Sequence, residues 1–294
     1  MKRGVYYLAD KNDVMKTKQY YIAYFDILGY KNFFEDKESD IQIFLQNNKS
    51  IAIDTADITT EENDISQSVI YKSFSDNFIV LIEADSFSEY EIMLFLSRQI
   101  ATLQFKFLME YQIPIRGAIT KGEAYIDDDI VFGSGLIKAV ELEGKNALYP
   151  RIIIDDKIEK DIVNYVVKKG LIAKDEDEKY YLDFFSLLTN KTYHFDIEAD
   201  EKQKIVKFCN QVVALVVRYA HIKNNLSDLS KINESAKTIY KYVWLMTKYN
   251  EFVDSRKIPA RINHEVVLNK KYMIYEIRNV KRGAWPVVAN CYIK

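Results

Sequence analysis

The first regular pattern in the chain is a short run in which nearly every side chain is apolar. Residues 20–25, YYIAYF, are apolar on both faces of an extended chain, which is typical of a central buried strand. Asp26 follows at once, and the ILGYK segment after it predicts a turn into a helix that begins near Gly29 or Tyr30. A carboxylate at the end of a buried strand is costly unless donors or a cation meet it, so Asp26 needs a partner.

The next 120 residues alternate between strand-like and helix-like patterns. Within residues 68–84, two β-rich runs flank a turn-forming Ser-Asp-Asn triplet, which predicts a hairpin with Asp76 at its tip. Residues 86–113 keep a helical period, start with the capping-box pair Ser88 and Glu91, and stop at Pro114. Further segments predict a second hairpin, a short helix and a strand, over residues 114–133, 133–147 and 151–155. The order predicts an α+β fold with a ferredoxin-like split βαβ core.

The pattern changes after about residue 185. Residues 201–223 and 231–253 have the apolar spacing of two helices joined by NNLSDLS, which predicts a helical hairpin. The tail, residues 257–294, again has mixed strand-like patterns. We therefore expect a catalytic unit over residues 1–185, with residues 186–294 as a helical extension packed on it.

Composition narrows the function classes. Apolar residues make up 48% of the 294 positions and charged residues 29%, as in ordinary globular proteins, and the net charge of −2 gives no general attraction to nucleic acid or anionic membranes. The longest apolar run, VVALVV, is too short to span a bilayer, and the N-terminus has no apolar signal region. The two cysteines fit no metal or disulfide spacing. We expect a cytoplasmic protein that binds neither nucleic acid nor membrane.

Asp26 and Asp76 are the first candidates for chemistry. Neighbouring strands of a split βαβ core would bring both carboxylates to one edge of the sheet, where a divalent cation could hold them together. Two such ions can stabilise the attacking and leaving oxygens at a phosphorus, and backbone N–H groups at Gly29 and Tyr30 could seat a triphosphate. A helix cap at Asp26 and a plain turn residue at Asp76 are the structural alternatives.

Four segments in this order resemble the class III nucleotidyl cyclases and their palm-like relatives. They are YFDILGYKNF, KSFSD, IRGAITKGEAYI and FGSGLIKAVELE, and the resemblance covers about residues 20–155. It implies a palm core of the cyclase type. It also implies that Asp26 and Asp76 hold two Mg²⁺ or Mn²⁺ ions, with the carbonyl of Ile27 as a further ligand.

The sequence departs from that family at two positions. The family's transition-state asparagine falls on Ile137 and its phosphate-stabilising arginine falls on Glu141. The segment FGSGLIKAVELEGKNALYPRIIID is instead similar to the pyrimidine cyclases of Pycsar antiphage systems. This resemblance implies a homodimer with composite active sites that converts UTP or CTP to cyclic UMP or cyclic CMP plus pyrophosphate, which then acts on a separate cyclic-nucleotide-sensing effector.

The resemblance also implies roles for several basic residues. Arg116 matches the family's strand arginine and would meet the terminal phosphates, and Lys72 stands where purine cyclases read the base. Arg151 is the candidate replacement for the missing arginine, with Lys121 and Lys138 behind it. The structural alternatives are a surface strand residue for Arg116 and a solvated lysine for Lys72. For Arg151 the alternative is a structural ion pair with Asp155, Asp156 or Glu143.

Two other functions stay open at this point. An adenylate or guanylate cyclase is compatible with Lys72 but not with the loss of the asparagine and arginine. A catalytically silent palm domain that binds a nucleotide or a partner is favoured by Ile137 and Glu141.

Overall fold

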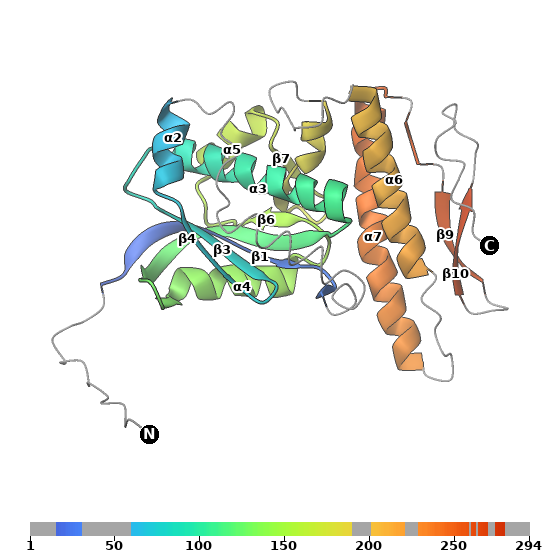
Figure 1. The fold of residues 1–294 in the computed structure, drawn as a ribbon, viewed down its shortest axis with the longest axis horizontal. Coiled ribbons are helices and arrows are strands. Elements are labelled where there is room, and N and C mark those ends of the chain that lie inside the picture. The colour runs from blue at the N-terminus through green and yellow to red at the C-terminus, as the bar shows by residue number, and fades with distance from the viewer. Residues whose placement is uncertain are drawn as a thin grey trace.

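The computed structural model of the chain describes seven segments of it. These are residues 16–30, 60–189, 201–220, 229–258, 260–262, 264–269 and 274–279. None of the helices in these segments is long and apolar enough to cross a membrane. An extended sheet and a pair of long helices dominate the described part (Figure 1).

Four antiparallel strands form the centre of the sheet. Their order is β2-β3-β1-β4, and β1 pairs with β3 on one side and with β4 on the other. This order is that of a ferredoxin-like split βαβ core, so the prediction of fold class is confirmed. The strands are β1 (Lys18–Ile27), β2 (Ile70–Phe74), β3 (Asn77–Glu83) and β4 (Ile115–Ile126).

The sheet continues beyond β4 with strands that the sequence did not fully predict. β6 pairs with β4 in parallel, and β8 and β7 then add antiparallel strands at the edge, while β5 forms a short hairpin with β4. The hairpin of β4 and β5 and the strand β6 were expected, whereas β7 and β8 were not. These strands are β5 (Val131–Phe132), β6 (Ile152–Ile154), β7 (Ile172–Lys174) and β8 (Tyr180–Leu182).

The described helices divide between the two faces of the sheet. α4 lies on one face, and α2, α3 and α5 lie on the opposite face (Figure 1). Because side chains alternate along a strand, the even positions of β1 (Tyr20, Ile22, Tyr24) pack in the cluster on the α4 side, and the odd positions join the main core beneath α3. Asp26, an even position, therefore lies on the α4 side. The helices are α2 (Thr60–Gln67), α3 (Glu89–Tyr111), α4 (Ser134–Asn146) and α5 (Lys160–Lys168).

Two glycines let α4 approach β4 closely. An added Cβ at Gly122 would lie 2.6 Å from the Cα of Gly135, and one at Gly135 would lie 2.7 Å from the Cδ1 of Ile22. Such contacts are too short for real atoms, so both positions require glycine.

The C-terminal helical hairpin is present and shares the main core. α6 (Glu201–Ala220) and α7 (Leu229–Ser255) stand side by side at one end of the sheet (Figure 1). Phe208 of α6 and Tyr249 of α7 belong to the same buried cluster as the residues beneath α3. The short helix η1 (Phe184–Leu188), also buried there, spans the expected boundary at residue 185, and that division into two units stays a prediction. The tail contributes β9 (His264–Asn269) and β10 (Ile274–Asn279).

Three local details differ from the sequence-based expectations. Residues 60–67, a polar stretch in the sequence, form α2. Ser88 is the N-cap residue of α3, but its side chain makes no capping hydrogen bond. The helix ends at Tyr111 rather than at the proline, because Gln112 adopts a left-handed conformation with φ of 55° and its N–H bonds back to Leu108.

Candidate functional site

The register of β1 brings Asp26 and Asp76 to the same edge of the sheet. Asp26 lies opposite Asn77, the first residue of β3, and the backbone N–H of Ile27 donates to the carbonyl of Asp76 at 3.2 Å. Asp76 occupies the two-residue loop between β2 and β3, since Phe74 pairs with Asn77 across that loop. The charge of Asp76 also raises the pKa of the Asp26 carboxyl. The two carboxylates therefore lie close enough to interact, as the split βαβ topology predicted.

Arg116 occupies both oxygens of Asp26. The two residues are directly paired across β1 and β4, which puts their side chains on one face of the sheet. The Nε of Arg116 donates to Oδ1 of Asp26 at 3.0 Å, and Nη2 donates to Oδ2 at 3.2 Å. This bidentate pair is 16% exposed at Asp26 and 21% at Arg116, so a small anion or cation from solvent can reach it. Sequence reasoning placed both residues in the site but did not pair them.

Glu143 of α4 is a third carboxylate in the site. Its Oε1 lies 2.7 Å from Nη2 of Arg116, an ion pair that lacks hydrogen-bonding geometry. The sequence considered Glu143 only as a partner of Arg151. Its spacing was a usable signal, because Gly135, Ala139 and Glu143 recur every four residues on the buried stripe of the helix.

Burial dominates the protonation of these carboxylates. Burial raises the pKa of Asp26 above its usual range, although hydrogen bonds and charge from Arg116 oppose the shift. Burial and then the charge of Asp26 raise the pKa of Glu143 to about 7. The positive charges around Asp26 and Glu143 therefore do not offset burial, and an additional cation would be bound favourably there.

Lys241 of α7 interacts electrostatically with Arg116, Asp26 and Glu143, and sequence reasoning missed it. Burial and the neighbouring Arg116 lower the pKa of Lys241, while the charges of Asp26 and Glu143 oppose the shift. The signal was present in YKYVWLMTK, where two lysines stand seven residues apart in an otherwise apolar stretch and therefore on one face of a helix.

Tyr24 and Asn77 hold the hairpin against β1. The hydroxyl of Tyr24 donates to the Oδ1 of Asn77, whose Nδ2 donates to Oδ1 of Asp76 at 3.4 Å. Burial, followed by the charge of Glu143, raises the pKa of Tyr24 to about 12, so its hydroxyl stays protonated at neutral pH. These contacts fix the position of Asp76 relative to β1.

The segment after Asp26 has the turn that the sequence predicted. Gly29 has a φ of 79°, a left-handed conformation that favours glycine, and the N–H of Leu28 donates to the carbonyl of Pro114 at 2.9 Å. Tyr30 begins a helix and packs against the main core, and the residues after it lie outside the described part of the chain. The triphosphate seat at Gly29 and Tyr30 therefore stays a prediction, as does the metal-binding carbonyl of the buried Ile27.

Lys72 lies on the same side of the sheet as Asp26. It pairs with Ile79, which belongs to the cluster on the α4 side, and its Nζ donates to the carbonyl of Asp128 at 2.7 Å. The bond ties β2 to the loop between β4 and β5. Base recognition by Lys72 stays a prediction.

Lys121 is not brought to the site. It pairs with Tyr21, an odd position of β1, so its side chain points to the α3 face, opposite to that of Asp26. Its Nζ binds Glu89 at the start of α3 at 2.7 Å. Lys121 is five positions along β4 from Arg116, so their Cα atoms are about 17 Å apart along the strand. Contact of Lys121 with a substrate held at Asp26 does not fit this placement.

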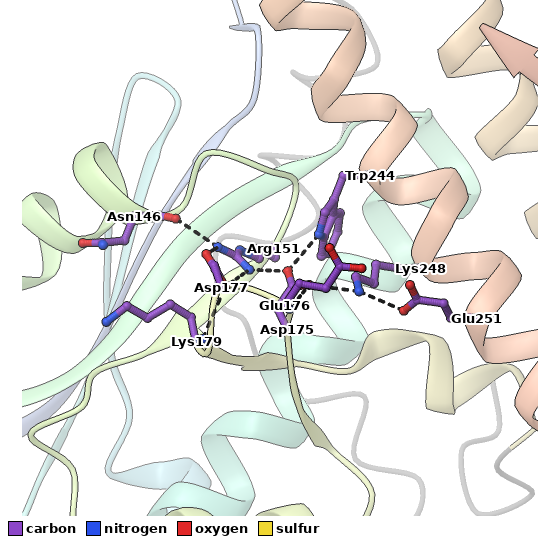
Figure 2. A network of polar contacts seen from close by, with 9 residues as sticks. All are labelled: Asn146, Arg151, Asp175, Glu176, Asp177, Lys179, Trp244, Lys248 and Glu251. Carbon is purple, nitrogen blue, oxygen red and sulfur yellow. Dashed lines mark hydrogen bonds and ion pairs between the residues drawn. The ribbon is translucent and has the colours of Figure 1, made fainter.

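Arg151 is a buried structural residue in this fold. Its guanidinium is wholly buried and binds Asp175 and Asp177 of the loop between β7 and β8, and its Nη2 also donates to the carbonyl of Asn146 at 3.3 Å (Figure 2). A phosphate would have to displace two carboxylates to reach it. The structural alternative for Arg151 fits, but with partners other than Asp155, Asp156 and Glu143.

The two positions where the chain departs from the cyclase pattern lie on the outer side of α4. Ile137 is 62% exposed, and Glu141 is also exposed and pairs with Lys145 at 3.6 Å. Neither contacts the Asp26 group.

The residues at this edge fit a magnesium-type ion in part. Among the described residues, no group of three or more His, Cys, Asp or Glu side chains could hold a metal on its own. Two carboxylates and a backbone carbonyl are the hard oxygen donors that Mg²⁺ and Mn²⁺ prefer, with the remaining ligands supplied by phosphates and water. Arg116 covers both oxygens of Asp26, so an ion bound there must compete with it.

Comparison with known proteins gives only distant structural likenesses. No family model and no curated protein matches the sequence. Among solved structures, the catalytic core of a rhodopsin-guanylyl cyclase with converted specificity, in complex with ATPalphaS, is similar with a TM-score of 0.38 and 13% identity, over 57% of this chain and 96% of that one. An adenylate/guanylate cyclase/hydrolase from Silicibacter pomeroyi has a TM-score of 0.34 and 16% identity, over 57% and 95% of the two chains. Likeness at this level says nothing of what this chain binds.

Proposed function

We propose that the protein is a nucleotide cyclase that converts a pyrimidine nucleoside triphosphate, UTP before CTP, to its 3′,5′-cyclic monophosphate and pyrophosphate. The observation that carries this proposal is the convergence of Asp26 and Asp76 at one sheet edge, beside Arg116 and below a turn that leads into a helix. Carboxylates and an arginine in this arrangement suit a triphosphate with its divalent ions. As in the Pycsar-like sequences, the cyclic product would act on a separate effector in antiphage defence.

Each side chain has a definite part in this proposal. Two bound Mg²⁺ or Mn²⁺ ions would supply charge neutralisation at the triphosphate and activation of the ribose 3′-hydroxyl. Asp26 and Asp76 would hold those ions with the carbonyl of Ile27. Arg116 moves from Asp26 to the phosphates, where a guanidinium can bind two oxygens at once. Lys72, on the same side of the sheet, donates to a carbonyl of the base.

The proposed preference for pyrimidine nucleotides rests on the absence from α4 of the asparagine and arginine of the purine cyclases. The positions of the purine cyclases' asparagine and arginine hold Ile137 and Glu141, which cannot perform the same roles. A purine cyclase would have to replace both functions. The same two residues would also suit a palm domain without catalytic activity.

A homodimer is part of the proposal, because α4 exposes apolar side chains. Ile137 is 62% exposed, Val140 is 42% exposed, and Phe132 of β5 is 44% exposed beside them in sequence. Exposed apolar side chains favour a protein partner, and a second copy of the chain is the partner that composite active sites require.

The first experiment offers each of the four nucleoside triphosphates to the purified protein with Mn²⁺. Chromatography of the products and a pyrophosphate assay measure turnover. Cyclic UMP or cyclic CMP supports the proposal, cyclic AMP or cyclic GMP would reassign it to the purine cyclases, and no pyrophosphate from any of the four would indicate a silent domain.

A second experiment tests the dimer. Val140→Asp places a charge on the exposed side of α4 and should shift the sedimentation coefficient from dimer to monomer, with loss of turnover. Lys207→Asp, on the exposed side of α6, serves as the control. A wild-type protein that sediments as a monomer and still forms a cyclic product would contradict the composite site.

A further inference from the structure

Lys241 lies on the inner face of α7, together with residues that are firmly anchored. Trp244 and Lys248 follow it by three and seven residues, so the three share one face of the helix. Trp244 and Lys248 are both buried, and seven residues of helix correspond to about 10 Å. The rotation of α7 about its axis therefore directs Lys241 towards the sheet.

A buried ionic network fixes that rotation. Asp175 accepts hydrogen bonds from the Nε1 of Trp244 at 2.8 Å, and its other oxygen lies 2.9 Å from the Nζ of Lys248 (Figure 2). Arg151 binds the same carboxylate from the opposite side. Tyr149 stacks on Trp244 with ring planes 5° apart. α7 is thus held to the β7–β8 loop by charged and aromatic contacts.

The same network lies next to the Asp26 group in the fold. The carbonyl of Arg151 accepts from the N–H of Gly117 at 3.1 Å, and Gly117 follows Arg116 in β4. Asn146, whose carbonyl binds Arg151, is one turn of α4 beyond Glu143. Two elements of the Asp26 group are therefore tied to the anchor of α7.

Lys241 has charge available for a ligand. In the part of the chain that the structure describes, it makes no hydrogen bond and no ion pair, whereas Arg116 is engaged by Asp26 and Glu143. The group holds three carboxylates, Asp26, Asp76 and Glu143, against these two cations. With metal ions bound to the carboxylates, Lys241 would remain as a half-buried ammonium available to a phosphate.

We propose that Lys241 is a substrate-binding residue that donates to a non-bridging oxygen of the polyphosphate. This inference deepens the proposed function and rests on it for the identity of the substrate. It gives a role to the helical extension: α7 supplies, within the same chain, a cation for the phosphates that the outer side of α4 lacks at Glu141. Arg151 then acts through the buried network as a positioning residue.

The test compares Lys241→Met with Lys241→Arg and with Lys207→Met, an exposed lysine on α6. Binding of inorganic tripolyphosphate in the presence of Mg²⁺ is measured by titration calorimetry, and KM and kcat are measured with the nucleotide that the wild type turns over. Loss of a charged hydrogen bond predicts that Lys241→Met binds tripolyphosphate about 10-fold to 100-fold more weakly. Lys241→Arg should recover most of the affinity, and Lys207→Met should behave as wild type.

Four outcomes separate the two proposals. Weaker tripolyphosphate binding by Lys241→Met with an unchanged melting temperature supports the phosphate-binding role, even if the wild type turns over no nucleotide, which would overturn only the proposed reaction. Wild-type binding by Lys241→Met overturns the role, even if the cyclase reaction is found. A lowered melting temperature with unchanged affinity marks Lys241 as structural and also overturns it. A wild-type protein that binds no tripolyphosphate overturns it as well.

Discussion

Two polar clusters of this protein use similar residues for different purposes. The Asp26 cluster combines Asp26, Asp76, Glu143, Arg116 and Lys241, and the Arg151 cluster combines Arg151, Asp175, Asp177, Trp244 and Lys248. They lie next to each other in the sheet. The pKa values of Asp26 and Glu143 are raised in the first, where burial outweighs the charges of Arg116 and Lys241. In the second, burial alone would raise the pKa of Asp175, but donors led by Lys248 lower it.

The difference lies in how many donors each carboxylate has. Asp175 has two cations, the indole N–H and a backbone N–H, so its charge is compensated without any ligand. Glu143 has one ion pair, which lacks hydrogen-bonding geometry, so its charge is not compensated. A buried cluster whose carboxylates are compensated stabilises a fold specifically, and one whose carboxylates are not compensated favours the binding of ions. The comparison predicts opposite responses of the two clusters to mutation.

The largest effect is expected from Arg151→Met. Removing the buried guanidinium takes one of two cations from the buried Asp175, whereas the half-exposed Asp177 can be solvated, so the free energy of unfolding should fall by about 3 kcal/mol. Urea unfolding followed by circular dichroism measures the change. A loss below about 1 kcal/mol would mean that the cluster does not hold α7 in place.

The next largest effect is expected from Asp76→Ala, and it falls on activity rather than on stability. Loss of a metal-binding carboxylate should reduce kcat/KM by about 100-fold or more, which equals about 2.7 kcal/mol. Because Asp76 lies in a hairpin loop, the melting temperature and the oligomeric state should stay close to those of the wild type. Full turnover by a folded Asp76→Ala variant would remove Asp76 from the metal site.

Glu143→Gln should change the pH dependence of stability. The carboxyl pKa is about 7 in the folded protein against an ordinary value of 4.5, so between these values the folded state keeps a proton that the unfolded state has lost. The wild type should therefore lose stability, on the order of 2 kcal/mol, as the pH rises from 4.5 to 7, and then level off. The glutamine variant should lack this decline.

Urea unfolding at pH 5 and pH 8, with a chelator present, measures the difference. Glu141→Gln is the matched control, since Glu141 is exposed on the same helix. An equal decline in the wild type and in Glu143→Gln would place the responsible group elsewhere.

The smallest effect is expected from Lys145→Ala. Its ion pair with Glu141 is at 3.6 Å and exposed on both sides, so the free energy of unfolding should change by less than about 0.5 kcal/mol. Turnover should also be unchanged. A loss comparable with that of Arg151→Met would contradict the contrast between surface and buried pairs.

Much of the fold could be predicted from patterns within single elements. The apolar run of β1, the turn residues around Asp76 and the period of α3 each depend on neighbours in sequence. The strands β7 and β8 could not be predicted, because three residues are too short to show a period. The capping hydrogen bond expected from Ser88 is absent, because a serine at that position permits the bond but does not require it.

The site divides in the same way. Topology alone brought Asp26 and Asp76 together, because neighbouring antiparallel strands fix which residues face each other. The partners of Arg151 come from a loop about 25 residues away and from α7, and nothing local in YPRI indicates them. Lys121 was misplaced for a simpler reason, because the alternation of a strand turns it to the face opposite to Arg116.

The sequence by itself determined the split βαβ core, the helical hairpin after it and the two aspartates at the edge of the sheet, since these follow from periodicity and from chain connectivity. Only the tertiary structure decided which charged side chains are paired. Pairing depends on distances between elements far apart in the chain, and burial then sets the free-energy cost of each unpaired charge. The packing of these elements therefore pairs Arg116 with Asp26 and buries Arg151.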